Sequence, residues 1–278
     1  MEINQNHSNS KVTPSFSRRE KQGEGFTFTI ITATFNAAHT LERTLQSVAQ
    51  QTFRNVEHII MDGGSTDRTL AIAKAYQQQN SDLKVTIVSE RDKGLYDALN
   101  KGIRLAKGRY LIFLNAGDKF HANNTLQKVA ERIKYNPDGK LPAVVYGETD
   151  IVDDAGMFLR HRRLQAPETL KWTSFRQGML VCHQSFYALR EITPEYDLTY
   201  RFSADFDWCV RIMKKAKEMG MPFLNTHSIL TDYLAEGLTT QNHNESLRER
   251  FRIMAKHYGW LSTCLMHLWF IIRNYIQK

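Results

Sequence analysis

Strand-like and helix-like segments alternate through the first half of this chain, and that alternation limits the fold more than any other feature of the sequence. Four runs rich in β-branched and apolar residues are separated by segments in which apolar side chains recur every three or four positions; the runs are 28–35, 56–61, 85–89 and 110–115. Strands joined by single helices form a parallel sheet with helices on both faces. Ligands of such sheets bind at the carboxyl ends of the strands. Functional residues are therefore expected in the loops that follow these strands.

The pattern changes after Asp118. A helix around Leu126 is followed by a predicted β-hairpin with its turn at 153–156, and then by a helix over 206–219 with Ser203 as its N-cap. Residues 241–278 have the spacing of amphipathic helices. We expect a disordered segment over 1–25, which has no apolar run suited to a signal peptide, one domain over 26–240, and a helical tail over 241–278.

The positive charge is unevenly distributed. The formal net charge is +8, and residues 158–176 contribute +4 while residues 248–278 contribute +5. Basic segments of this kind bind phosphates, nucleic acid or anionic lipid, or are simply solvated. Nucleic-acid binding is not expected, because no strand interleaves aromatic and basic residues. The longest apolar stretch, 260–272, is shorter than the roughly 18 residues that a membrane-spanning helix needs.

Several functional classes are disfavoured by what the motifs lack. Cys182, Cys209 and Cys264 are far apart, so neither a disulfide framework nor a thiolate zinc site is expected, and a reducing compartment fits best. His227 and His243 do not have the spacing of a zinc-binding HExxH motif. The phosphate-binding patterns G-x-x-x-x-G-K-[ST] and G-x-G-x-x-G are absent, which disfavours ATPases and ordinary dehydrogenases.

Three loops with carboxylates follow predicted strands and should meet at one edge of the sheet; they are residues 62–67, 90–94 and 115–118. The first contains Gly63 and Gly64, which let the backbone approach a ligand, and Ser or Thr residues that could cap the next helix. A tight turn followed by a helix cap would use the same residues. This loop alone therefore does not separate a functional role from a structural one.

The three loops stand in the order and spacing of a known family. Residues 29–53 (TIITATFNAAHTLERTLQSVAQQTF), 56–69 (VEHIIMDGGSTDRT) and 89–118 (SERDKGLYDALNKGIRLAKGRYLIFLNAGD) resemble the nucleotide-sugar domain of inverting family 2 glycosyltransferases, especially bacterial enzymes of O-antigen, capsule and exopolysaccharide synthesis. The match is looser over 120–240. The resemblance implies an α/β GT-A (Rossmann-like) fold, a mostly parallel sheet flanked by helices, with a C-terminal helical appendage. Residues 26–118 would be the nucleotide-sugar half and 119–240 the acceptor half.

The resemblance also implies roles for single residues. The residues that would bind the nucleotide sugar are Thr32, Thr34, Asn36, Asp62, Asp92, Lys93 and Asn115. Among them, Asp62 would accept the imide N–H of a uracil-like base, and Asp92 and Lys93 would contact nucleotide and diphosphate.

Asp118 falls at the last carboxylate of the family's D-x-D element, where a divalent cation, Mg²⁺ or Mn²⁺, neutralises the leaving diphosphate. Its loop has one carboxylate where many relatives have two or three, which suggests that the metal arrives with the nucleotide sugar.

Asp205 occupies the place of the family's catalytic base. Because Ala204 replaces the usual Glu before it, Asp207 remains an alternative base, and both carboxylates also suit the first turn of a helix without any catalytic role. His183, within the sequence Cys182–Ser185, is expected on the acceptor side, although an isolated histidine is more often structural. Residues 233–240 resemble the family's glycine-containing loop after the last strand of the sheet.

We therefore expect an enzyme, an inverting glycosyltransferase of the hexosyltransferase type. It would move a sugar from a nucleotide-sugar donor, UDP-linked, to a hydroxyl of a glycan or lipid-linked acceptor in cell-surface polysaccharide synthesis. The alternatives are a noncatalytic nucleotide-sugar-binding or scaffold protein of the same fold, and a sugar nucleotidyltransferase, whose glycine-rich basic signature near the first strand is missing.

The resemblance and the basic tail together give an expected location. We expect a cytoplasmic protein, peripheral at the inner face of the membrane, with residues 248–278 against an anionic membrane surface. Docking of the tail on its own domain or on a second copy, as a homo-oligomer, is left open.

Overall fold

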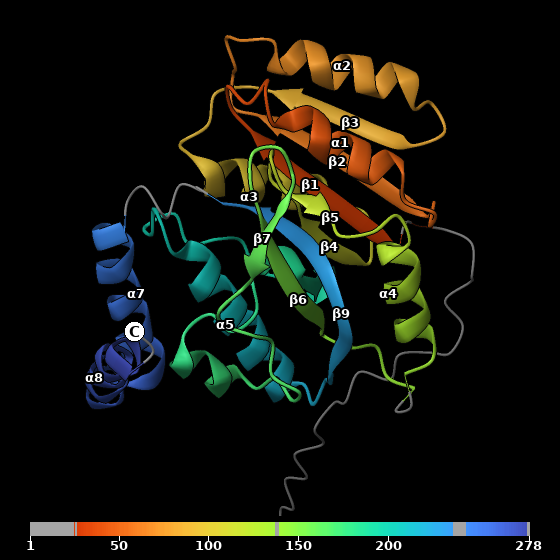
Figure 1. The fold of residues 1–278 in the computed structure, drawn as a ribbon. Coiled ribbons are helices and arrows are strands. Elements are labelled where there is room, and N and C mark those ends of the chain that lie inside the picture. Colours follow the sequence, from red (N-terminus) through yellow and green to blue (C-terminus); the bar gives the residue numbers. More distant parts are fainter. Residues whose placement is uncertain (1–24, 26, 137–138, 236–242, 277–278) are drawn as a thin grey trace, which may run out of the picture.

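The computed structural model describes residues 25, 27–136, 139–235 and 243–276 (Figure 1). These residues form one nine-stranded sheet of order β3-β2-β1-β4-β8-β6-β9-β5, with β7 paired to β6. The strands are β1 Phe28–Thr34, β2 Val56–Asp62, β3 Lys84–Ser89, β4 Tyr110–Phe113, β5 Lys119–Phe120, β6 Val144–Val152, β7 Phe158–His161, β8 Phe186–Leu189 and β9 Phe223–Leu234.

Seven α-helices and three short 3₁₀ turns are described around the sheet. The helices are α1 Leu41–Ala49, α2 Thr69–Gln79, α3 Leu95–Leu105, α4 Thr125–Lys134, α5 Ala204–Glu218, α7 His243–Tyr258 and α8 Trp260–Ile276. The 3₁₀ turns are η1 Trp172–Gln177, η2 His183–Ser185 and η3 Arg190–Ile192.

The first half of the sheet is parallel, as predicted. β1 lies between β2 and β4, and both pairs run parallel in register from Phe28, which faces Val56 on one side and Tyr110 on the other. All residues of β1, β2 and β4 are buried. Parallel strands are covered by helices on both faces, so they need apolar side chains at nearly every position, and this is why their sequence runs lack alternation.

The second half of the sheet mixes strand directions. β8 is antiparallel to both β4 and β6, whereas β6 and β9 run parallel. The predicted hairpin is confirmed, since β6 and β7 pair antiparallel around a turn in which Gly156 has a φ of 80°. A positive φ is cheap only for glycine, which explains the residue at this place.

Helix α5 is fixed by an aromatic cluster beneath its first turns. Trp208 is fully buried, stacks on Tyr196 with ring centroids 5.1 Å apart, and meets the edge of Phe113 from β4 at 5.2 Å. The helix begins at Ala204, two residues before the predicted start. Ser203 is its N-cap residue, as predicted. The Ser203 hydroxyl does not cap the helix and donates instead to the backbone oxygen of Ser246 at 3.2 Å.

The tail forms two helices that stand together beside α5 (Figure 1). Gly259, with a φ of 87°, separates α7 from α8. Helix α7 packs on α5 and η1, and α8 packs on α7 and η1. Among the described residues, no helix combines the length and the apolar character needed to cross a bilayer. Residues 1–24 of the segment expected to be disordered, and residues 236–240 of the expected glycine-containing loop, lie outside the described residues.

Candidate active site

A cavity of about 460 Å³ opens at the carboxyl end of the parallel strands. The cavity is lined by the ends of β1, β6 and β9, the loop after β4, the starts of α3 and α5, Arg162 after β7, and η2 with the residues before it. The predicted site residues that line it are Thr34, Asn115, Asp118, His183 and Asp205. The cavity is thus built by residues from both halves of the chain, and of the three predicted loops only 115–118 lines it.

A second cavity, of about 710 Å³, adjoins the first and shares Thr34, Phe35 and Tyr96 with it. Asp92 and Lys93 line this cavity. A Cβ atom on Gly63 would lie 2.6 Å from the Asp92 carboxylate, so the glycine after β2 leaves the space that Asp92 occupies. The loops after β2 and β3 are therefore packed against each other at the edge of this cavity.

Three polar side-chain atoms in the first cavity are buried without a hydrogen-bond partner: Thr34 Oγ1, Asn115 Oδ1 and His183 Nε2. Buried polar atoms are nearly always hydrogen-bonded, and leaving one unpaired costs about 1–3 kcal/mol. Three such atoms from β1, the loop after β4 and η2 point to a polar ligand that completes their hydrogen bonds.

Asp118 is buried at the floor of the first cavity, with its side chain held from two sides. One oxygen accepts the Leu234 amide at 3.0 Å and the other accepts the Gln184 side-chain amide at 3.0 Å. Burial raises the pKa of Asp118 to about 6, although these hydrogen bonds act in the opposite direction. The carboxylate is thus costly to ionise until a positive charge comes near.

Asp205 begins α5 and faces the same cavity. Its Oδ2 lies 3.5 Å from His183 Nδ1, and its Oδ1 accepts the Tyr96 hydroxyl at 3.3 Å and the Phe206 amide at 2.8 Å. Burial alone would raise the pKa of Asp205, but the contact with His183, the charge of Arg250 and the Phe206 amide together lower it. Asp205 is therefore an anion near neutral pH, as a general base must be.

Three residues of the predicted nucleotide site do not line either cavity. Thr32 is fully buried, and its hydroxyl donates to the Leu114 carbonyl at 2.7 Å. The Asp62 carboxylate accepts hydrogen bonds from Ser65 and from the Ser89 hydroxyl, as the tight-turn alternative requires. Asn36 has a φ of 46°, and its side-chain oxygen accepts the Thr66 amide at 2.9 Å. The structure gives these three side chains partners within the protein.

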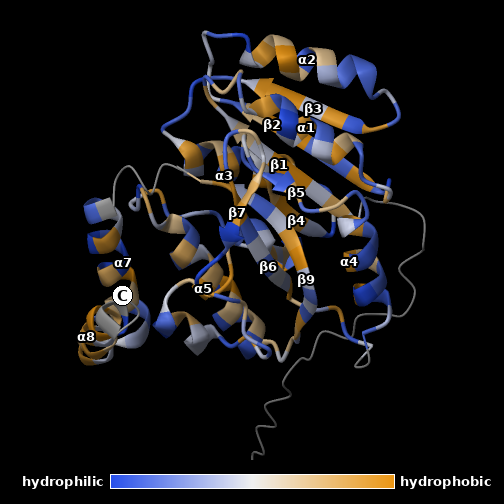
Figure 2. Cartoon of the chain, in the orientation of Figure 1, coloured by the Kyte–Doolittle hydropathy of each residue, from blue (hydrophilic) through white to orange (hydrophobic). Residues whose placement is uncertain are grey.

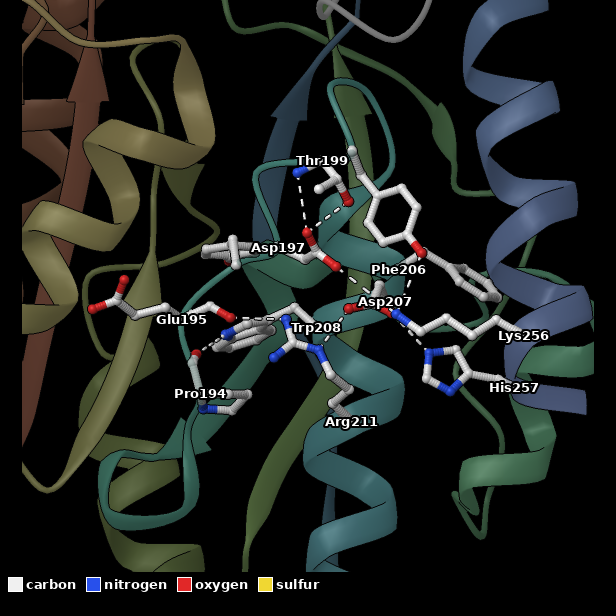
Figure 3. A network of polar contacts seen from close by, with 12 residues as sticks. Pro194, Glu195, Asp197, Thr199, Phe206, Asp207, Trp208, Arg211, Lys256 and His257 are labelled. Carbon is white, nitrogen blue, oxygen red and sulfur yellow. Dashed lines mark hydrogen bonds and ion pairs between the residues drawn. The ribbon is translucent and has the colours of Figure 1, made fainter.

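Asp207 does not line the cavity either; it belongs to a polar network between α5 and α7 (Figure 3). Its carboxylate is fully buried and meets Arg211, His257 at 2.8 Å and Lys256 at 3.7 Å. Burial alone would raise the pKa of Asp207, but the hydrogen bond to His257 and the charge of Arg211 lower it. Of the two candidate bases, only Asp205 faces the cavity.

Several residues at the cavity were missed from the sequence. Tyr96 and Gln184 hold the two carboxylates, and Arg162 donates to the carbonyls of Met179 and Leu180 and so fixes the segment that precedes η2. Gln184 stands next to His183, and Arg162 lies in the basic 158–176 segment. Their neighbourhood was therefore visible in the sequence, but not their orientation.

The first cavity fits a divalent cation carried by a diphosphate. It offers a carboxylate, an unpartnered amide oxygen and an unpartnered imidazole nitrogen, from Asp118, Asn115 and His183, and Mg²⁺ and Mn²⁺ readily bind through few protein ligands plus phosphates and water. Another group, His121, Asp150 and Asp232, has its ligand atoms within 4.8 Å of one another. Lys119 already lies 3.2 Å from Asp232, and none of these three residues lines the two adjoining cavities.

Comparisons with known proteins identify the family. Residues 29–192 match the family described as glycosyl transferase family 2. The PGL/p-HBAD biosynthesis glycosyltransferase of Mycobacterium bovis (BCG Pasteur) is 35% identical over 187 residues, covering 66% of this chain and 68% of the relative. The amylovoran biosynthesis glycosyltransferase AmsB of Erwinia amylovora is 26% identical over 230 residues, covering 80% and 74%.

Solved structures with low sequence identity share the fold. TarS 1–349 of S. aureus, in complex with UDP, superposes with a TM-score of 0.62 at 17% identity, covering 84% of this chain and 65% of that one. The mannosyltransferase PcManGT of Pyrobaculum calidifontis, in complex with GDP-Man and Mn²⁺, gives 0.58 at 17% identity, covering 88% and 71%. This chain thus spans less than two thirds of TarS 1–349.

The chain belongs to family 2 of the glycosyltransferases, and it is an enzyme of that class. The predicted GT-A fold with C-terminal helices is confirmed.

Proposed function

We propose that this glycosyltransferase transfers a sugar from a UDP-sugar to a hydroxyl group of a glycan or lipid-linked acceptor, with inversion at the anomeric carbon, in the assembly of a cell-surface polysaccharide or glycolipid. The observation that carries the proposal is the single cavity in which Asp118, Asp205 and three unpartnered polar atoms meet. The names of the mycobacterial and Erwinia relatives support the product class, and the UDP complex of TarS supports the nucleotide.

The two cavities divide the substrate between them. Asp92 and Lys93 border the 710 Å³ cavity and are the residues assigned to the nucleotide and its diphosphate, with Thr34 at the junction. An ammonium group beside a diphosphate offsets its charge. In this assignment Thr32, Asn36 and Asp62 shape the loops around the nucleotide rather than contact it.

Asp118, with Asn115 and His183 beside it, would hold the Mg²⁺ or Mn²⁺ that comes with the nucleotide. The cation supplies charge stabilisation for the diphosphate as it leaves. Asp118 is held towards the cavity by Gln184 and Leu234, so the carboxylate keeps its position before the donor binds.

Asp205 acts as the base. It removes the proton of the acceptor hydroxyl as that oxygen attacks the anomeric carbon from the face opposite the diphosphate; the new C–O bond forms, and the bond to the diphosphate breaks with its electron pair. Tyr96 and the Phe206 amide fix one carboxylate oxygen, and the other lies near His183. Because its pKa is lowered, the base is ionised at neutral pH.

The test replaces the two candidate bases separately. Asp205→Asn keeps the shape and removes the basicity, so we expect sugar transfer to fall by about 10²–10⁴-fold with UDP-sugar affinity nearly unchanged. Asp207→Asn, assayed below its melting temperature, should retain most of the turnover. The measurements are initial rates over a panel of UDP- and GDP-sugars, product stereochemistry by NMR, and donor affinity by calorimetry. A larger loss in Asp207→Asn, or a product that retains the donor configuration, contradicts the assignment.

A further inference from the structure

One face of α8 is apolar and exposed. Seven large hydrophobic side chains of this helix are between 42% and 69% exposed: Trp260, Leu261, Leu265, Leu268, Trp269, Ile271 and Ile272. At 100° per residue they span one half of the helix. Figure 2 shows this run of hydrophobic residues on α8 at the edge of the molecule, beside α7. Exposed apolar surface gathered on one helix marks a contact with another surface.

The opposite face of α8 is packed on the protein and fixes the helix in place. Thr263 is fully buried, Met266 and Phe270 pack against the core, and the His267 ring meets Phe251 of α7 with centroids 4.9 Å apart. The exposed half is therefore not the face by which α8 packs on its own domain. It remains uncovered after α8 has made its own intramolecular contacts.

The two basic segments of the sequence meet at this helix. Both α7 and α8 pack on η1, which begins within the 158–176 segment, and Tyr258 stacks on Trp172 with centroids 5.4 Å apart. Exposed basic residues of these two segments include Arg163, Lys171, Arg248 and Arg252. No acidic residue follows Glu249 in the sequence. An apolar face in a region of net positive charge is complementary to an anionic bilayer.

Arg273 and Arg163 give an independent sign of the same kind. Partial burial, followed by the positive charge of Arg163, lowers the pKa of Arg273. The two guanidinium groups thus add positive charge at the end of the apolar helix.

We propose that the exposed half of α8, together with the exposed basic residues Arg163, Lys171, Arg248 and Arg252, is a docking surface for an anionic lipid bilayer, on which α8 lies in the interface without crossing it. Aliphatic and tryptophan side chains enter the boundary between headgroups and acyl chains, and arginines and lysines contact the phosphates. The inference rests on the proposed function only in explaining why a bilayer is useful to the enzyme, because a lipid-linked acceptor is found there.

The docking surface lies close to the cavity along the chain. Residues 172–177 form η1 beneath α7 and α8, and Met179, two residues later, lines the first cavity. One short segment of the chain, residues 172–179, therefore contacts both the helices of the tail and the cavity that contains Asp205.

The experiment measures co-sedimentation of the full chain with vesicles, without any sugar nucleotide present. The vesicles contain phosphatidylglycerol and phosphatidylcholine in equal amounts, or phosphatidylcholine alone. We expect the protein to sediment with the anionic vesicles, to do so less as salt is added, and to remain mostly in solution with the neutral ones. The double variant Leu265→Glu/Trp269→Glu should lose this binding at least tenfold.

The control is Tyr135→Glu, which places a glutamate on an exposed aromatic residue outside the docking surface, at the end of α4, and should sediment like the original chain. Circular dichroism and turnover on a water-soluble acceptor establish that each variant is folded, so docking and catalysis can fail separately. Equal sedimentation of the double variant would overturn the proposal. The proposal would also be overturned if the original chain did not bind vesicles but formed a concentration-dependent dimer by light scattering, and the double variant stayed monomeric.

Discussion

Gly63 and Asp92 belong to different loops, yet the missing side chain of one makes room for the carboxylate of the other. Single contacts of this kind decide which polar residues reach the cavity. Thr32 and Thr34 point the same way along β1, but only Thr34, at the strand end, reaches the cavity, because His58 and Leu114 cover Thr32. Alternation along a strand predicts which face a residue is on but not what covers it. The sequence could therefore predict that Asp118, His183 and Asp205 lie at the site, but it could not show that Thr32 is covered.

Gly63→Ala should lower donor affinity with little effect on stability. The φ of Gly63 is not in the left-handed region, so alanine fits the backbone, but its methyl group displaces the Asp92 carboxylate. We expect UDP affinity to fall by about tenfold, the loss of one charge-assisted hydrogen bond. Calorimetry on Gly63→Ala, Asp92→Ala and the double variant measures the coupling. Fully additive losses would show that Gly63 does not act through Asp92.

Asp118 should make the cation-free protein less stable as the pH rises. Its folded pKa is about 6 against an ordinary value of 3.8, so the folded state resists ionisation, and stability present at about pH 4 is lost as the pH passes through 6. Two pKa units correspond to about 3 kcal/mol. Thermal melts of the original chain and Asp118→Asn across this range, with chelator, should differ by this slope, because all other groups titrate alike in the two chains. Mn²⁺ with UDP should restore stability at pH 7 only when Asp118 is present; identical pH slopes would contradict this.

Helix α7 holds the turn before α5 through a contact that the sequence pattern does not indicate. Glu249 accepts the backbone N–H groups of Arg201, Phe202 and Ser203 at 2.7–3.0 Å, just before Asp205. The strands, the hairpin and most helices were predictable because burial on one or both faces leaves a periodic pattern. A carboxylate that binds backbone amides from 46–48 positions away leaves none, so the tail was read as an appendage.

Glu249→Ala should lower the transfer rate through the position of Asp205. With three amides released, the turn before α5 loses its anchor, and a displacement near 1 Å at a reacting group can cost about 10²-fold in rate. We expect the rate at saturating donor to fall more than tenfold in Glu249→Ala and to recover in part in Glu249→Gln, which retains one acceptor oxygen. Glu245→Ala, at an exposed position in the first turn of α7, is the matched control. A lowered melting temperature with an unchanged rate would mean that Glu249 only stabilises the fold.

At the scale of the whole molecule, the part of the tail up to Tyr258 is connected by hydrogen bonds to the start of α5. Residues of α7 touch the start of α5 through Glu249 and Ser246, and Asp207 through His257. Helix α8 makes no described hydrogen bond to either cavity-lining carboxylate, Asp118 or Asp205. We therefore expect different roles for the two helices of the tail: α7 supports the active site, and α8 does not.

Two truncations should show which helix the activity depends on. A chain ending at Gly259 loses α8 but retains Glu249 and His257, and should keep most of its turnover on a water-soluble acceptor, with a lower melting temperature because Phe251 loses the ring of His267. A chain ending at residue 242 loses α7 as well and should have almost no turnover. Rates per folded molecule, judged by circular dichroism, are compared for both chains. Equal activity of the two chains would show that α7 does not support the site.

The break at Gly259 also bears on how the reaction rate depends on the concentration of acceptor, once α8 docks on a bilayer as proposed. An enzyme resting on a bilayer through α8 searches a plane rather than a volume, so its rate follows the mole fraction of acceptor in the lipid and falls when inert lipid is added at constant total acceptor. Released from the plane by removal of α8, the same catalytic unit responds to bulk concentration alone. With the proposed docking of α8, the helix after Gly259 would therefore decide between surface-dilution kinetics and ordinary saturation kinetics.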